Sequence, residues 1–258
     1  MSSRTLGVVI PAYQPDIELL DRYIERINNH LDPATILIEL DAPEPETVLA
    51  LRSLPVTVET VPHRRGKGTA ITAGFETLET DLYLFADADG STPVDSLADI
   101  VAPVRQHQTA LAVGSRRHPD AEIEDEQSRA RQFLGGCFSW LAGSLLPVTL
   151  HDYQCGAKAI HAHAWNQVHH HLYEPGFAWD VELIAMAGAL DLSITEVPVQ
   201  WEDQPGSTVD PVADAARMFR ALLTSRHRAK QLTDERLHSV IAAQTTQPTP
   251  LIEEVSEL

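Results

Sequence analysis

The 258-residue sequence predicts a single α/β domain built on a mostly parallel sheet flanked by helices. Two observations lead to this fold class. Short runs of β-branched and other apolar residues alternate with stretches of helical period, which is the pattern of successive β-α-β units. Hydrophobic residues make up 43% of the chain, enough to bury a large core. We place the domain at residues 1–236 and expect the acidic segment 237–258 to be a disordered tail.

The first half of the chain alternates strand and helix patterns without a break. Its first apolar run is expected to stop at Pro11, because proline lacks the N–H that continues a strand. The expected strands of this half are 6–10, 36–40, 56–61 and 82–86, and the expected helices are 17–31, 47–54, 69–78 and 94–104. Because ligands of a parallel sheet bind beyond the carboxyl ends of its strands, residues that follow these strands are candidate site residues.

The second half continues with longer helices. We expect strands at 110–114 and 194–201 and helices at 128–150, from 176 onward and at 212–232. The helix at 128–150 carries Trp140 and begins with arginines, and the helix at 212–232 is basic in an otherwise acidic chain. Both are candidate membrane-interface helices, and packing against the sheet is the alternative.

The charge balance is strongly acidic, with 37 Asp and Glu against 19 Lys and Arg and a formal net charge of −18. Fixed negative charge keeps a protein solvated, and its self-repulsion is screened at high ionic strength. This leads to the hypothesis of a halophilic host. The same balance argues against nonspecific nucleic-acid binding, which depends on clustered basic residues.

Two cysteines, Cys137 and Cys155, show no metal-ligand spacing, and we expect them to be reduced core thiols. No apolar run approaches the length of about 20 residues that a membrane-spanning helix needs. The first residues lack the charged and apolar pattern of a signal peptide. We therefore expect a cytoplasmic protein.

The segment 82–93 ends a buried strand with two carboxylates, Asp87 and Asp89. Residues at i and i+2 of an extended chain point the same way, so these side chains can converge. Hard oxygen ligands with room for water and phosphate suit Mg²⁺ or Mn²⁺. An Asp-rich turn is the alternative, but Asp41 follows another strand at the same expected edge. Three carboxylates there favour a site occupied by a cation or by sugar hydroxyls.

Seven motifs in order resemble the inverting family-2 glycosyltransferases of the GT-A fold, a Rossmann-like architecture. The match is similar in particular to the dolichyl-phosphate β-glucosyltransferase and dolichyl-phosphate mannose synthase branch. The motifs are Val-Val-Ile-Pro-Ala-Tyr at 8–13, Arg-Gly-Lys-Gly-Thr-Ala at 65–70, Asp-Ala-Asp-Gly at 87–90, Gly-Ser-Arg at 114–116, Asp-Tyr-Gln-Cys-Gly-Ala-Lys at 152–158, Trp-Asp-Val-Glu-Leu at 179–183 and the segment 201–207.

The resemblance implies a nucleotide-sugar donor and a divalent cation, Mg²⁺ or Mn²⁺. Pro11, Tyr13 and Asp41 would hold the base and ribose, with Lys67 close by. Asp87 would contact the sugar nucleotide. The full set implied for the donor is Pro11, Ala12, Tyr13, Asp41, Lys67, Asp87 and Ala88, and the set implied for the metal is Asp89 and Ser91.

The implied acceptor is a polyprenyl (dolichyl) phosphate. Arg116 and one of Arg129 or Arg131 would hold its phosphate, and Arg116 is counted as catalytic with Asp152 and Asp180. One of these two aspartates is the candidate base. A phosphate monoester is already anionic near pH 7, however, so both aspartates can instead orient sugar hydroxyls.

Several positions depart from the family pattern. Gln14-Pro15 replaces an Asn-Glu pair, Thr208 stands where a lysine is common, and Ser91 replaces the glutamine of the mannose synthases. These changes bear on the donor, for which UDP-glucose is favoured and GDP-mannose is the second candidate.

The alternatives to a transferase are a Mg²⁺-dependent phosphohydrolase that uses Asp87 as nucleophile and a non-catalytic sugar-nucleotide binding protein. We expect a peripheral contact with the inner face of the cell membrane. The sequence does not fix the oligomeric state.

Overall fold

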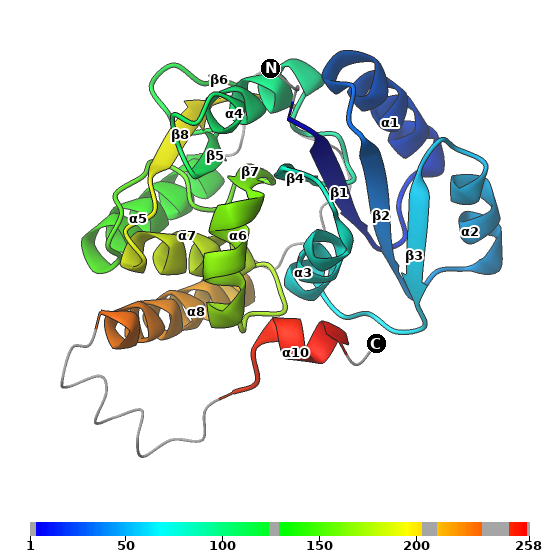
Figure 1. Cartoon of the computed structure of the whole chain (residues 1–258). Coiled ribbons are helices and arrows are strands. Elements are labelled where there is room, and N and C mark those ends of the chain that lie inside the picture. The colour runs from blue at the N-terminus through cyan, green and yellow to red at the C-terminus, as the bar shows by residue number, and fades with distance from the viewer. Residues whose placement is uncertain (1–3, 124–128, 203–210, 234–247, 257–258) are drawn as a thin grey trace.

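The computed structural model describes residues 4–123, 129–202, 211–233 and 248–256. The strands are β1 (Leu6–Ala12), β2 (Thr35–Asp41), β3 (Thr57–Val61), β4 (Leu82–Ala86), β5 (Leu111–Ser115), β6 (Glu122–Ile123), β7 (Ala157–His161), β8 (Ile194–Pro198) and β9 (Gln200–Trp201). The main sheet has seven strands in the order β3-β2-β1-β4-β7-β5-β8, and β6 pairs separately with β9. Helices cover both faces of the main sheet (Figure 1).

The helices are α1 (Ile17–Leu31), α2 (Pro45–Arg52), α3 (Lys67–Thr77), α4 (Val94–Arg105), α5 (Arg129–Leu145), α6 (Ala162–Val168), the 3₁₀ helix η1 (His169–His171), α7 (Trp179–Ala189), α8 (Pro211–Leu232) and α10 (Leu251–Ser256). The first layer consists of α1, α2 and α4 (Figure 1). Helix α1 begins where the Asp16 carboxylate accepts the Leu19 N–H at 3.0 Å, and its apolar stripe includes Leu20 and Ile24. Strand side chains alternate, so Val8 and Ile10 face this layer.

The opposite layer contains α3, α5, α6, α7, α8 and α10 (Figure 1). Val9 of β1 faces this side. Its centre is aromatic: the ring centroid of Phe75 lies 5.0 Å from that of Trp165, edge to face. The indole N–H of Trp179, the first residue of α7, donates to the Thr72 hydroxyl at 3.1 Å and so joins α7 to α3. These contacts fix α7 over the middle of the sheet, where it carries two acidic residues.

The predicted fold class is confirmed, and most expected elements lie within two residues of the observed bounds. One difference concerns a helix, because the helix expected at 128–150 ends at Leu145. Four differences concern strands. The strand expected at 194–201 is divided into β8 and β9, and the short β6 was not expected. β1 continues through Pro11 to Ala12, because Pro11 sits near the end of the strand. β7 was not expected, and it is the one antiparallel strand among the described strands of the main sheet, inserted between β4 and β5.

The expectation of a disordered tail over 237–258 is corrected for its last described part. Leu251 begins α10, is fully buried, and donates its N–H to the Leu172 carbonyl at 2.8 Å. This apolar side chain packs against the layer that contains α3 and α7. The contact holds in place α10, which is too short to be stable alone. The stretch 237–247 lies outside the described residues.

Two smaller expectations concern the cysteines and membrane spans. Cys137 and Cys155 are both free thiols, as predicted. Cys155 is in the core, as expected for both, but Cys137 is exposed. Within the described parts of the chain, no helix combines the length and apolar character needed to cross a bilayer.

Candidate active site

The ends of the central strands meet at one edge of the sheet. Ala12 of β1 pairs with Leu40 of β2, and Val9 pairs with Phe85 of β4, so these strands end side by side. β7 runs the other way, and its first residue, Ala157, lies opposite Ala86. The loop that precedes β7 therefore reaches the same edge as the loops that follow β1, β2 and β4. This arrangement unites motifs that are about 140 residues apart in the sequence.

Asp41, expected to contact the nucleotide, is buried and bound to the loop that precedes α3. Its Oδ2 accepts the backbone N–H of Arg65 at 2.7 Å and of Gly66 at 3.1 Å, and its Oδ1 accepts Arg65 Nε at 2.8 Å. Arg65 Nη2 also binds Glu39 Oε2 at 2.7 Å. The carboxylate of Asp41 thus shapes this basic loop directly.

The expected base-binding residues at the end of β1 lie beside the same loop. The Tyr13 side chain is exposed, and the Arg64 guanidinium carbon lies 4.3 Å from its ring centroid. Pro11 is half-buried and Ala12 is buried. The pair of Tyr13 and Arg64 presents a flat ring and a cation, which are the features that stack on a nucleobase.

Two lysines and two aspartates form a cluster beyond β4 that is buried except for the half-buried Asp87. Lys67 Nζ lies 2.8 Å from Asp87 Oδ1 and 3.3 Å from Asp180 Oδ2. Lys158 Nζ binds the other oxygen of Asp180 at 2.5 Å and the Cys155 carbonyl at 2.8 Å. Asp180, at the positive end of α7, is therefore shared between two ammonium groups.

The charges of this cluster set the pKa values of Lys67 and Asp87. Burial alone would lower the pKa of Lys67, but the carboxylates of Asp180 and Asp87 outweigh it and raise that pKa above its usual range. Burial raises the pKa of Asp87, and Lys67 opposes this rise. Lys67 therefore stays charged in the buried site and supplies the counter-charge that Asp87 needs.

Gly156 lets the Asp87 loop approach the loop that precedes β7. The Asp87 N–H donates to the Gly156 carbonyl at 2.9 Å. A Cβ atom at position 156 would lie 2.0 Å from Asp87 Oδ2, far inside van der Waals contact. The absence of a side chain at Gly156 is therefore what allows the Asp87 carboxylate to lie where it does.

Asp89 is exposed, and Gly90, at φ +68°, turns the chain after it. One carboxylate oxygen of Asp89 accepts the Ser91 N–H at 3.0 Å. Among the described residues, no three His, Cys, Asp or Glu side chains converge as a ready metal site. An exposed carboxylate with free lone pairs still suits Mg²⁺ or Mn²⁺ when the remaining ligands are water and phosphate oxygens. The residues present fit such an ion.

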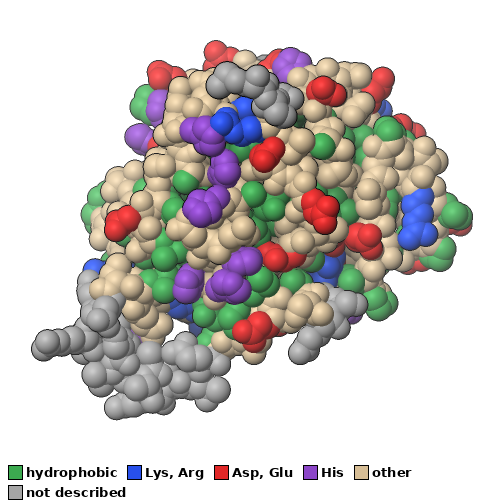
Figure 2. Space-filling model, viewed as in Figure 1, with side chains coloured by type: hydrophobic (Ala, Val, Ile, Leu, Met, Phe, Trp, Pro, Cys, Tyr) green, Lys and Arg blue, Asp and Glu red, His purple; other side chains and the backbone are tan. Residues whose placement is uncertain are grey.

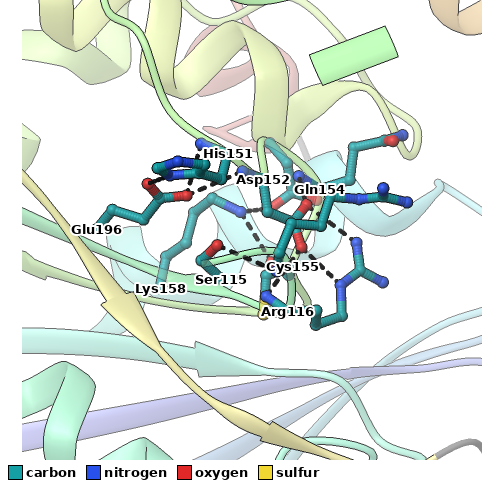
Figure 3. A network of polar contacts seen from close by, with 10 residues as sticks. Ser115, Arg116, His151, Asp152, Gln154, Cys155, Lys158 and Glu196 are labelled. Atoms are coloured by element: carbon teal, nitrogen blue, oxygen red, sulfur yellow. Dashed lines mark hydrogen bonds and ion pairs between the residues drawn. The ribbon is translucent and has the colours of Figure 1, made fainter. Parts of the chain in front are cut away.

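Arg116 and Asp152 form a two-point ion pair between the end of β5 and the loop that precedes β7 (Figure 3). Arg116 Nε lies 2.7 Å from Asp152 Oδ2, and Nη2 lies 3.0 Å from Oδ1. Burial alone would raise the pKa of Asp152, but the Arg116 charge and its hydrogen bonds outweigh it and lower that pKa to about 2. Asp152 is therefore an ionised anchor for Arg116.

Glu196 of β8 holds the backbone of this loop from the other side (Figure 3). Its Oε1 accepts the N–H of His151 at 2.8 Å and of Asp152 at 2.9 Å, and its Oε2 lies 2.7 Å from His151 Nδ1. The position of the Asp152 carboxylate, and with it the direction of Arg116, depends on this contact.

The structure brings some predicted residues together and leaves others undetermined. Lys67, Asp87 and Asp180 form one cluster, and Arg116 forms a second one with Asp152. Ala88 is half-buried between Asp87 and Asp89. The side chains of Arg129 and Arg131 lie outside the described part of the chain, although α5 itself is described. Thr208 also lies outside it.

Sequence reasoning assigned no site role to Lys158, Glu182 or Glu196. Lys158 had a detectable signal, because a lysine inside the apolar run Ala157–His161 needs a buried counter-charge. Glu182 had a weaker one, as a carboxylate inside a helix whose only other charged residue is Asp180. Glu196 had none, because its contacts depend on how β8 pairs with β5.

Comparison with known proteins identifies relatives of this chain. The profile described as Glycosyl transferase family 2 matches residues 7–163. The chain is 31% identical over 246 residues to dolichyl-phosphate beta-glucosyltransferase of Mus musculus, an alignment that covers 88% of this chain and 76% of that protein.

Solved structures share the fold. Glucosyl-3-phosphoglycerate synthase of Mycobacterium tuberculosis, in complex with Mn²⁺, UDP and glucosyl-3-phosphoglycerate, superposes with a TM-score of 0.68 at 16% identity, covering 87% of this chain and 80% of that one. Mannosyl-3-phosphoglycerate synthase of Rubrobacter xylanophilus gives 0.67 at 18% identity over 95% and 76%. These likenesses establish the GT-A fold.

Proposed function

The chain belongs to glycosyl transferase family 2, and on that premise we propose that it transfers a hexose from a nucleoside-diphosphate sugar to a polyprenyl phosphate. One observation carries the proposal. The Asp87 loop and the loop that precedes β7 meet at a 2.9 Å hydrogen bond between Asp87 and Gly156. This contact joins the motif implied for the donor to the motif that carries Asp152, the partner of Arg116. The named mouse relative is a dolichyl-phosphate beta-glucosyltransferase, so UDP-glucose and dolichyl phosphate are the preferred substrates.

We assign the donor to the edge of the sheet beyond β1 and β4. Tyr13 with Arg64 would stack on the base, and the backbone at Pro11 and Ala12 would line the ribose. Asp41 acts through the loop that it holds, because its carboxylate oxygens accept hydrogen bonds from Arg65 and Gly66. Lys67, Asp87 and Ala88 would lie along the diphosphate and the sugar.

Asp89, with Ser91 behind it, would hold the divalent cation. When bound, Mg²⁺ or Mn²⁺ would neutralise the charge that develops on the diphosphate leaving group. The Ser91 N–H already holds one carboxylate oxygen of Asp89, and this contact orients the second oxygen. The exposed side of Asp89 is where donor phosphates can complete the ligand set.

Arg116 would bind the acceptor phosphate, assisted by Arg129 or Arg131. An oxygen of that phosphate attacks the anomeric carbon, the new C–O bond forms, and the bond to the nucleoside diphosphate breaks with its electron pair on the leaving oxygen. The acceptor is already anionic near neutral pH, so no residue has to remove a proton. Asp152, ionised and bound to Arg116, and Asp180, shared between two lysines, then serve as positioning groups.

A peripheral membrane contact on the cytoplasmic face is part of the proposal, because the acceptor is a lipid. Helix α5 exposes 74% of Trp140, and α8 exposes Phe219 and Leu223, one turn apart, beside the exposed Arg220. Apolar insertion next to a cation is the pattern of an interfacial helix. Loss of cosedimentation with dolichyl-phosphate liposomes in a Trp140→Ser/Phe219→Ser variant would support this contact. Equal pelleting of the variant and the parent would contradict it.

The reaction is tested with one assay matrix in high KCl. UDP-glucose, UDP-N-acetylglucosamine and GDP-mannose are each combined with dolichyl phosphate and with Mn²⁺ or Mg²⁺. Transfer from one donor, lost in Asp89→Ala by a factor of about 10³ or more, is the expected result. Metal-dependent release of phosphate from simple phosphomonoesters without a nucleotide would indicate a phosphohydrolase instead. Donor binding without transfer to any acceptor would indicate a sugar-nucleotide binding protein.

A further inference from the structure

Glu182 is a fully buried carboxylate that the proposed reaction does not use. It lies on α7, two residues after Asp180. Its Oε2 accepts the backbone N–H groups of Tyr173 and Glu174, each at 2.7 Å. Its other oxygen binds the guanidinium of Arg228, which comes from α8. Glu182 therefore joins a loop of the second layer to the last turns of α8.

Arg228 makes the charged form of Glu182 tolerable. Burial raises the pKa of Glu182, and the Arg228 charge and the two N–H donors oppose that rise. The guanidinium carbon of Arg228 also lies 4.4 Å from the ring centroid of Tyr173, so it clamps the same loop through a cation–π contact. Removing one partner of such a buried pair is far more disruptive than removing both.

The loop held by Glu182 reaches the donor side of the site. The next carbonyl along it, that of Pro175, accepts the N–H groups of Gly68 at 2.9 Å and Thr69 at 3.2 Å. Both belong to the first turn of α3, the helix that begins at Lys67, where backbone N–H groups have no acceptor within the helix. A Cβ at Gly68 would lie 2.4 Å from the Glu174 carbonyl oxygen, so the loop and the helix start are in direct contact.

An unbroken series of contacts thus runs from α8 to the donor site. Arg228 binds Glu182, Glu182 fixes the backbone at 173 and 174, and Pro175 fixes the first turn of α3. Lys67 in that turn binds Asp87 at 2.8 Å. We propose that Arg228 is a positioning residue for the donor site, acting through Glu182 and the loop at 173–175 on Lys67. The reading of Lys67 as a donor-site group rests on the proposed function.

The kinetic test compares the two substrates of one enzyme. Arg228→Met is expected to raise KM for the nucleotide sugar about tenfold and to leave KM for the polyprenyl phosphate within about twofold, because Lys67 lies on the donor side. Arg228→Lys, which keeps the charge, should recover part of the loss. Arg22→Met, an exposed arginine on α1, is the matched control and should behave like the parent.

A second readout does not depend on activity. Backbone amide exchange at Gly68 and Thr69 should be about tenfold faster in Arg228→Met than in the parent or in Arg22→Met. If Arg228→Met does not fold, the neutral double variant Glu182→Gln/Arg228→Met replaces it, because it leaves no buried charge unpaired.

Two results would overturn the proposal: equal changes in both KM values, or unchanged exchange at Gly68 and Thr69. A parent enzyme that transfers no sugar would refute the proposed function, while the exchange measurement would still decide whether Arg228 holds the start of α3.

Discussion

Asp152 is too weak a base to take a proton from an acceptor near neutral pH. Its pKa is lowered from the ordinary 3.8 to about 2 in spite of its burial, because Arg116 binds both of its oxygens. A depressed folded-state pKa adds stability that is present above the unfolded value of 3.8 and is lost as the pH falls through about 2. The pair therefore stays ionised throughout the range in which the enzyme is assayed.

The first prediction concerns the acid side of the pH–rate profile. As the pH is lowered, we expect kcat/KM for the acceptor to fall with a midpoint of about 6, the second pKa of a phosphate monoester. The midpoint should be the same in the parent and in Asp152→Asn. The variant should lose about 10- to 100-fold in rate, because Arg116 loses its anchor. A midpoint that moves by a full unit in Asp152→Asn would show that Asp152 is the base. A phosphonate acceptor, with its higher second pKa, should shift the midpoint upward, whereas a limb set by a group of the protein would not move.

The second prediction concerns Gly156. A methyl group there would lie 2.0 Å from Asp87 Oδ2, so Gly156→Ala must displace that carboxylate from Lys67. We expect about a 10- to 100-fold loss of kcat/KM for the donor and weaker binding of the nucleotide in calorimetry.

The control for Gly156→Ala is a double-mutant cycle. In an Asp87→Ala background the methyl group has room, so adding Gly156→Ala should weaken nucleotide binding little further. If the loss in the double variant instead equalled the sum of the losses in the two single variants, Gly156 would act independently of Asp87. A melting temperature close to that of the parent would confirm that the fold is intact.

At the scale of elements, periodicity located most helices and strands because each pattern spans several residues. The apolar stripe of α1 and the runs of β1, β2 and β4 are examples, and their order along the chain gave the parallel sheet. β7 was missed because its second residue is Lys158, a charged residue that pairs with Asp180 from a distant helix. A charged residue in so short a run weakens the strand pattern, and the distant contact that neutralises it is not visible in the local sequence.

The candidate site was also predictable only where a short motif marks it. Asp87 and Asp180 were named from short motifs, and the structure places both against Lys67. The contacts of Asp41 with Arg65 and Gly66 were not predictable, since a carboxylate that binds its own loop and one that faces a ligand have the same sequence. The ion pair between Glu182 and Arg228 was not predictable, because its two residues are 46 positions apart and lie on different helices.

The third prediction belongs to α10. Leu251 is fully buried between α10 and the second layer, so Leu251→Ala should undock this short helix rather than unfold the domain. We expect at least about tenfold faster amide exchange at Leu251 and a fall in melting temperature of a few degrees, given about 2–4 °C per kcal/mol for a chain of this size. Glu254→Ala, at an exposed position of the same helix, should stay within about 0.5 kcal/mol of the parent. Unchanged exchange in Leu251→Ala would mean that α10 is held by other contacts.

At the scale of the whole molecule, the charges fall into two populations. The site charges are paired: Lys67, Lys158 and Arg116 each bind a buried or half-buried carboxylate at 2.5 to 2.8 Å. The surface charges are mostly acidic, and on the face seen in Figure 2 Asp and Glu are dispersed over several elements with few Lys or Arg between them. Salt screens the surface charges far more than the paired site charges, because dissolved ions surround exposed charges and do not enter the buried pairs.

The fourth prediction follows from this difference. With a net charge of −18, mutual repulsion at the surface should destabilise the fold at low ionic strength and be relieved as salt is added. We expect the melting temperature to rise by about 10 °C or more between 0.05 M and 2 M KCl, with most of the rise complete once the Debye length falls to about 3 Å. Asp21→Asn/Glu25→Gln removes an exposed pair of like charges one turn apart on α1, so it should raise the low-salt melting temperature and flatten the salt dependence. Equal stability at low salt and in molar KCl would refute salt adaptation, and the acidic surface would then need a different explanation, such as repulsion between copies of the chain.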